Sequence, residues 1–126
     1  MVTLGGYGVE WIVDASGCTP ARLTDRRALD GVFASVVEAL GLHPVGRASW
    51  HRFPVTRGLT GLLMLKESHL ACHTFPEFGG ACFNLYCCRP RPAWPWREEL
   101  ESRLGAARVV LRTLRRSYAS PREASA

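Results

Sequence analysis

The segment KESHLACHTFPE, residues 66–77, decides how this chain folds, because two predicted strands meet inside it. The first strand, Leu59–Lys66, ends just before the Glu67-Ser68 bond, and the second, His69–Phe75, begins just after it. Alternate residues of a strand share a face, so both histidines of the segment lie on one side of the sheet. A serine, two histidines and carboxylates in so short a stretch are uncommon in a purely structural strand. We therefore expect this segment to carry chemistry.

The rest of the chain alternates between strand and helix patterns. Apolar residues recur at helical spacing between Thr24 and Leu40, with Thr24 or Asp25 as the N-cap and Gly41 as the stop. Prolines exclude Arg89–Pro95 from a central strand, because proline lacks a backbone donor. The other predicted elements are strands at Tyr7–Val13, Gly46–Phe53, Ala81–Cys88 and Ala107–Leu114, a helix from Pro95 or Trp96 to Leu104, and a flexible tail over residues 117–126.

These elements predict one α+β domain over residues 1–126, a two-layer α/β sandwich with a mainly antiparallel sheet. Neither Leu59–Leu65 nor Ala81–Cys88 alternates cleanly between apolar and polar residues, so both faces of the sheet need cover. One layer of helices covers one face. We therefore expect the other face to pack on the same face of a second copy, which gives an αββα homodimer.

The composition is that of a folded protein, with 47% hydrophobic residues. The N-terminus lacks the basic and apolar regions of a signal peptide, and no apolar window is long enough to cross a bilayer. The five cysteines form an odd set, which favours reduced thiols over a disulfide framework. We therefore expect a cytoplasmic protein with no membrane partner.

The formal net charge is +5, and many of the arginines lie between Arg103 and Arg122. Such a cluster can mark a nucleic-acid-binding module. No aromatic platform or nucleic-acid motif accompanies it, so we interpret the cluster as a solvated face and do not expect a nucleic-acid partner.

The polar residues of the 66–77 segment can have purely structural roles or can take part in chemistry. His69 and His73 lie four residues apart, as in a helical zinc pair, but the His-Glu-x-x-His pattern is absent and no metal site is predicted. His73 can be an ordinary sheet histidine, and Ser68 an ordinary turn serine. A serine hydroxyl can also attack the carbonyl of the preceding peptide bond when donors stabilise the oxyanion. The Glu67-Ser68 bond is therefore a candidate for self-cleavage.

From Leu4 to Cys88 the sequence resembles the bacterial S-adenosylmethionine decarboxylase proenzymes. The residues that carry the resemblance occur in order and without gaps: Ser68, His69, His73, Pro76 and Glu77. The resemblance implies self-cleavage between Glu67 and Ser68, with a pyruvoyl cofactor generated from Ser68. A pyruvoyl carbonyl forms a Schiff base with the substrate amine and accepts electrons as carbon dioxide leaves.

The resemblance also implies roles for further residues. His73 takes the proton lost in the elimination step, Thr60 supports processing, and Cys88 returns a proton to the substrate carbon. The substrate-binding residues are an aromatic that stacks on adenine, a second aromatic, and a carboxylate that binds the ribose hydroxyls: Phe53, Phe75 and Glu77. The implied function is decarboxylation of S-adenosylmethionine, a small amino-acid-type substrate, for polyamine synthesis.

Several positions depart from the family pattern. Thr60 replaces a serine, Asn84 replaces an aspartate, and Cys87-Cys88-Arg89 replaces a Thr-Cys-Gly pattern. These changes lie close to the predicted substrate site and leave a second reaction open, the pyruvoyl-dependent decarboxylation of L-arginine or L-ornithine. A non-catalytic regulatory paralogue is a further alternative. The joint presence of Ser68, His73 and Cys88 argues against it.

Overall fold

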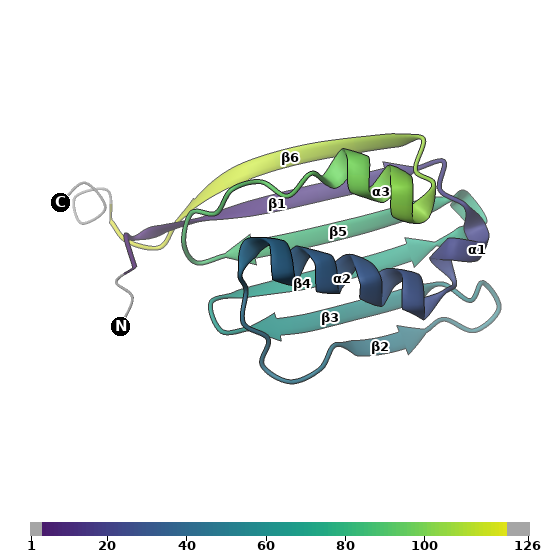
Figure 1. The fold of residues 1–126 in the computed structure, drawn as a ribbon, viewed down its shortest axis with the longest axis horizontal. Helices are drawn as coiled ribbons and strands as arrows, with labels where there is room; N and C mark the ends of the chain where they lie inside the picture. The colour runs from purple at the N-terminus through teal and green to yellow at the C-terminus, as the bar shows by residue number, and fades with distance from the viewer. Residues whose placement is uncertain (1–3, 121–126) are drawn as a thin grey trace.

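The sheet of this protein has six strands in the order β2-β3-β4-β5-β1-β6, and every neighbouring pair is antiparallel. The computed structural model describes residues 4–120 (Figure 1). Sequential strands β3, β4 and β5 pair as a meander, and the first strand then inserts between β5 and β6. The strands are β1 Tyr7–Ser16, β2 Ser49–Arg52, β3 Leu59–Leu65, β4 Ser68–Phe75, β5 Gly80–Cys87 and β6 Arg108–Ser117.

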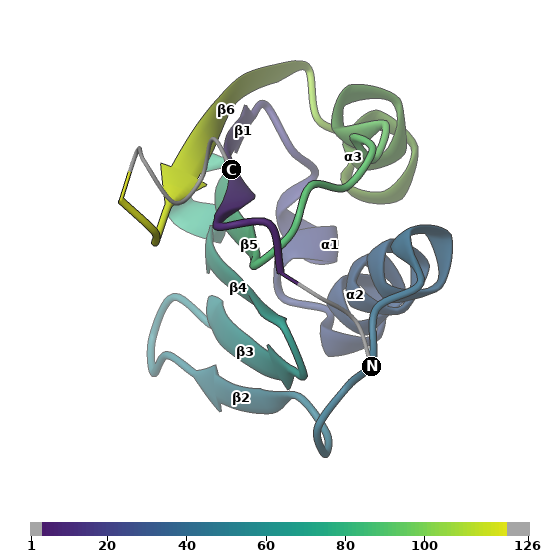
Figure 2. The same cartoon turned by 90° about the vertical axis from the view of Figure 1, so that its left-hand side faces the viewer.

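The helices lie on one face of this sheet (Figure 2). The long helix α2, Arg26–Leu40, begins where the Asp25 side chain accepts a hydrogen bond from the Arg27 amide, and ends at Gly41 with φ of 62°. Both ends agree with the sequence prediction. The others are α1 Pro20–Leu23, α3 Trp96–Leu104 and the 3-10 turn Pro76–Phe78. Helix α1 was not predicted, because four residues are too few to show a helical period.

The two faces of the sheet differ sharply in burial. In β4 and β5 buried residues alternate with partly buried or exposed ones, so the core lies between the sheet and the helices. On the other face, which we call the open face, Leu62 and Met64 are 52% and 59% exposed. The structure confirms the predicted α+β sandwich with an antiparallel sheet.

Several element bounds differ from the prediction by a few residues. Strand β2 is shorter than predicted, and β1 and β6 are longer. Residue 117, where we expected the tail to begin, is the last of β6, and the amides of Tyr118 and Ala119 donate to the Gly6 carbonyl. Residues 121–126 of the expected tail lie outside the described part. No helix among residues 4–120 is long and apolar enough to span a membrane.

Candidate active site

A tight turn places the Glu67-Ser68 bond at one end of the sheet. Leu65 pairs with Ser68, so only Lys66 and Glu67 connect β3 to β4. The Cys88 backbone N–H donates a hydrogen bond of 2.7 Å to the Glu67 carbonyl oxygen. This oxygen would carry the negative charge if Ser68 attacked the preceding peptide bond, so the Cys88 N–H is placed as an oxyanion donor.

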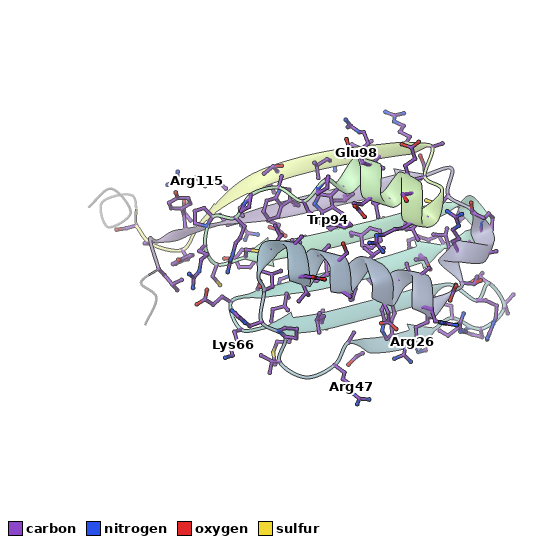
Figure 3. The ribbon with its side chains drawn as sticks, viewed as in Figure 1. Arg26, Arg47, Lys66, Trp94, Glu98 and Arg115 are labelled. Carbon is purple, nitrogen blue, oxygen red and sulfur yellow. The ribbon has the colours of Figure 1, made fainter. Side chains whose placement is uncertain are left out.

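Further contacts hold both partners of this hydrogen bond. The Tyr118 hydroxyl donates to the Cys88 carbonyl at 2.9 Å. Arg89 donates from Nε to the Glu67 carboxylate at 2.6 Å, and its Nη2 contacts the same oxygen. We call Glu67, Ser68 and Cys88 the cleavage end of the sheet; Lys66, labelled in Figure 3, marks its turn. Arg89 therefore takes part in a contact that the family's glycine could not make.

The cleavage end has different surroundings on the two faces. Ser68 pairs with buried Cys87, and its hydroxyl hydrogen-bonds the Cys87 thiol. Burial raises the pKa of that thiol to about 11, although the charge of Arg91 and the Ser68 hydrogen bond act in the opposite direction. Cys88 instead lines an open-face groove of about 580 Å³, together with Ser68 and neighbouring side chains that include Leu62, Met64, His69 and Tyr86. The two adjacent cysteines therefore differ in environment.

A hydrogen-bond network crosses four strands beside this groove. The Asn84 amide nitrogen donates to Glu10 at 2.6 Å, and its oxygen lies 3.1 Å from His69 Nε2. Arg116 donates to the other oxygen of Glu10. A carboxylate only accepts, so Asn84 must turn its oxygen toward His69, and His69 Nε2 carries the proton. In the neutral imidazole, Nδ1 is then the acceptor.

Glu10 is kept ionised by its partners in this network. Partial burial raises the pKa of its carboxyl group, but the hydrogen bonds from Asn84 and Arg116 outweigh burial and leave the pKa below its usual value. His69 also stacks on Tyr86, with ring centroids 5.7 Å apart. The network and the stack together fix the orientation of His69 beside Ser68.

The predicted substrate residues gather at the opposite end of the sheet. Phe53, Phe75 and Glu77 line a pocket of about 330 Å³ with Pro54, Thr56 and Thr74. We call Phe53, Phe75 and Glu77 the aromatic end. The adjacent loop holds Val55 at φ of 69° and 96% exposed, an uncommon conformation for a β-branched residue. This end therefore exposes apolar side chains and an unusual loop to solvent.

The predicted processing residues do not meet at the cleavage end. His73 Nδ1 lies 3.0 Å from the Thr60 hydroxyl, directly across the β3–β4 ladder. His73 lies five residue steps along the extended strand from Ser68, which is roughly 16 Å at about 3.3 Å per step. Within one chain the structure thus brings Ser68 and Cys88 together and leaves His73 and Thr60 nearer the aromatic end.

Some residues with contacts at the site were not predicted from the sequence. These are the Cys88 backbone N–H, the Tyr118 hydroxyl, the Arg89 guanidinium, and the network that orients His69. The His69-Asn84 pairing follows from strand register, which a single sequence does not fix. Only the position of Arg89, directly after Cys88 and at a departure from the family pattern, could have suggested its role.

Comparison with known proteins identifies the family. The family model described as S-adenosylmethionine decarboxylase matches residues 9–117. A protein named S-adenosylmethionine decarboxylase proenzyme 2 from Halalkalibacterium halodurans is 32% identical over 80 residues, which cover 64% of this chain and 61% of that protein. The proenzyme from Thermococcus kodakarensis is 30% identical over 88 residues, 70% of this chain and 60% of its own length.

A third relative aligns over a longer part of the chain. The S-adenosylmethionine decarboxylase proenzyme of Moorella thermoacetica is 27% identical over 116 residues, which cover 91% of each protein. The matched region of the family model includes the cleavage end, the aromatic end and all six strands apart from the first two residues of β1. The resemblance noted from the sequence is thereby confirmed, and the chain belongs to the S-adenosylmethionine decarboxylase family.

Proposed function

We propose that this chain is a proenzyme that cuts itself between Glu67 and Ser68 and then decarboxylates S-adenosylmethionine. The observation that carries the proposal is the 2.7 Å hydrogen bond from the Cys88 N–H to the Glu67 carbonyl oxygen. It supplies a preorganised donor where negative charge develops during attack on the bond. The relatives named as proenzymes support the same conclusion.

The proposed cleavage uses only this chain and water. The Ser68 hydroxyl adds to the Glu67 carbonyl carbon, the carbon–nitrogen bond breaks, and an ester and a free amine result. A base removes the Ser68 Cα proton, the Cβ–Oγ bond breaks, and Glu67 leaves as a carboxylate. The remaining dehydroalanine takes up water and releases ammonia, which yields a pyruvoyl group at residue 68. Ser68 fits this role because it follows the turn directly and its preceding carbonyl is held by Cys88.

In turnover the pyruvoyl group supplies an electron-accepting carbonyl, as carbonyl cofactors of decarboxylases do. The chain's own residues bind the substrate and move the proton. Cys88, which shares the groove with Ser68, returns a proton to the substrate carbon. Phe53 and Phe75 offer π-faces to the adenine and the sulfonium, and Glu77 accepts hydrogen bonds from the ribose.

S-Adenosylmethionine fits this arrangement better than arginine or ornithine does. The cationic ends of arginine and ornithine need a carboxylate in the groove. Asn84 stands where the family has aspartate, and the nearby Glu10 is already bound by Asn84 and Arg116. The aromatic end, in contrast, offers the flat surfaces that an adenosyl group requires.

The active form in this proposal is a homodimer of processed protomers, because one chain keeps the needed groups too far apart. Ser68 and His73 are separated by roughly 16 Å of strand, far beyond the reach of a proton transfer. A two-fold axis that lies between two open faces and runs across the strands brings the cleavage end of one copy to the aromatic end of the other. Each site then contains Ser68 and Cys88 from one protomer and His73 and Glu77 from its partner.

The open face has the character of a surface that becomes covered. It exposes Leu62, Met64 and Leu114, and also Phe75 at the aromatic end. An apolar face of this kind on an antiparallel sheet is commonly buried against another sheet. The five cysteines are all free, which suits the reducing cytoplasm that we propose as the location.

The test of the proposed function has two stages on one preparation. Intact mass measurement of the folded protein should show two fragments that meet at the Glu67-Ser68 bond, with the C-terminal fragment blocked to Edman degradation. The processed protein should then release carbon dioxide from S-adenosylmethionine and not from arginine or ornithine. A chain that stays intact after long incubation would refute the proenzyme, and release from arginine or ornithine alone would refute the substrate.

A further inference from the structure

A second cavity lies beside the Glu67-Ser68 bond, apart from the open-face groove. It has a volume of about 250 Å³ and is bounded by the segment after α2 and by the loop after β5. Of its lining residues, only Lys66, Glu67 and Ser68 also line the groove. The full lining is Gly41, Leu42, His43, Lys66, Glu67, Ser68, Arg89 and Arg91. We call this cavity the basic pocket.

The basic pocket contains more positive than negative charge. Its lining has three cations, Lys66, Arg89 and Arg91, and one carboxylate, that of Glu67. Arg89 donates a hydrogen bond from Nε to the Glu67 carboxylate at 2.6 Å and so pairs with that charge. The other two cations have no carboxylate among the lining residues, which leaves a surplus of two positive charges beside the bond.

Arg91 has one buried donor without a partner in the described part of the chain. Its Nη1 donates to the Leu40 carbonyl at 3.0 Å, but its buried Nε has no hydrogen-bond partner among residues 4–120. Its charge acts on the Cys87 thiol, which hydrogen-bonds the Ser68 hydroxyl. Buried donors without partners are rare in folded proteins, so Arg91 keeps a hydrogen-bond donor that the described residues do not use.

We infer that the basic pocket is the receptor for the α-carboxylate that self-cleavage creates at Glu67. This inference rests on the proposed function. Cleavage keeps the original Glu67 carbonyl oxygen, which the Cys88 N–H already contacts at 2.7 Å, and adds the former Ser68 Oγ as the second carboxylate oxygen. One negative charge therefore appears beside Arg91 and Lys66, and the surplus in the pocket falls from two to one.

The pocket has two consequences for the processed protein. Charge-assisted hydrogen bonds to the new carboxylate hold the end of the first fragment in the fold. They also stabilise the cleaved state relative to the intact one, because the intact chain carries only a neutral carbonyl at this position. The Glu67 side chain remains with Arg89 in both states.

The experiment compares Arg91→Gln in two forms of the full chain. One form is the processed protein, and the other is the uncleaved Ser68→Ala protein. Loss of one charge-assisted hydrogen bond should lower the melting temperature of the processed form by roughly 3–6 °C more than that of the uncleaved form, at equal protein concentration. Arg91→Lys, which keeps the charge, should retain most of this difference.

Arg97→Gln is the matched control, because Arg97 also donates a partly buried hydrogen bond to a backbone carbonyl, that of Val109, far from the pocket. Arg97→Gln should lower the melting temperature by the same amount in the processed and the uncleaved form. Equal losses for Arg91→Gln, or a failure of Arg91→Gln to fold in the uncleaved background, would show a structural role and overturn the receptor. Absence of cleavage in the unmodified protein would instead refute the proposed function, and the receptor with it.

Discussion

The two ends of the β4 strand differ in how complete they are within one chain. At the cleavage end, contacts from the loop after β5 and from Tyr118, the residue after β6, hold Glu67 and Cys88. At the aromatic end, Phe75 is 38% exposed and Glu77 lies at the surface. The groups at the cleavage end are held by contacts within one chain, while those at the aromatic end are more exposed. The proposed division of the reaction between two protomers would bring these two ends together.

Ser68→Ala should have the largest effect of any substitution at the cleavage end. It should abolish self-cleavage completely, because alanine has no hydroxyl to attack the Glu67 carbonyl and form the ester. The turn and the Cys88 N–H contact are made by the backbone, so the variant should fold normally. Intact mass measurement after long incubation checks the result. Ser49→Ala, at the first residue of β2, is the control and should cleave like the unmodified chain.

The division between protomers is tested by His73→Ala. Alone, this variant should process about 10²- to 10⁴-fold more slowly, the range for loss of a general base. In a mixture with Ser68→Ala chains, half-sites recombine so that one site has both Ser68 and His73. Cleavage of the His73→Ala chain should then recover, as followed by mass spectrometry.

The control for this mixture uses a chain that carries both substitutions. Mixing it with His73→Ala leaves every site without His73, so cleavage should stay slow. A His73→Ala chain that cleaves at the normal rate alone, or that gains nothing from Ser68→Ala partners, would contradict the shared site.

Cys88→Ala separates the two functions of the cleavage end. The oxyanion donor is a backbone N–H and survives the substitution, so self-cleavage should continue. Loss of the thiol should lower kcat by about 10²- to 10⁴-fold, because the general acid is removed. Cys87→Ala, on the buried face, should leave kcat close to normal. Normal turnover in Cys88→Ala with loss in Cys87→Ala would reverse the assignment.

Substitutions at the aromatic end should affect substrate binding and leave cleavage alone. Phe53→Ala and Glu77→Gln should each reduce kcat/KM for S-adenosylmethionine by about 5- to 30-fold, the effect of losing 1–2 kcal/mol of stacking or hydrogen bonding. Phe78→Ala is the control, since Phe78 is 83% exposed at this end and does not line the pocket. Equal losses in all three variants would indicate that the aromatic end does not bind substrate.

The sequence predicted the elements of this fold better than it predicted their contacts. The α2 period and its caps are local, and so are the strand patterns of β3 to β5. The end of β6 was missed because its last residues, Arg115, Arg116 and Ser117, are all polar and show no strand pattern. The Glu67-Cys88 hydrogen bond and the Tyr118 contact depend on register between distant strands, which local patterns do not encode.

The separation of Ser68 from His73, in contrast, was present in the sequence. Once both residues are placed in one extended strand, five residues of rise fix their distance at roughly 16 Å. This distance is consistent with the proposal that Ser68 and His73 of one site come from different protomers. The sequence interpretation had treated the two residues as one local site.

The smallest predicted effect concerns the two faces at the cleavage end. Burial raises the pKa of the Cys87 thiol from its ordinary 9.0 to about 11. The folded state therefore prefers the neutral thiol, and this preference contributes stability that is complete below pH 9 and is lost as the pH rises toward 11. Between pH 8 and pH 10 the free energy of unfolding should fall by about 1 kcal/mol through this group.

Urea unfolding over this pH range should show a smaller fall in the free energy of unfolding for Cys87→Ala than for the unmodified chain. Iodoacetamide at pH 8 should modify the partly exposed Cys88 before the buried Cys87. An unchanged fall in Cys87→Ala, or prior modification of Cys87, would mean that the buried face opens at this end and that the contrast between the faces is weaker than the structure indicates.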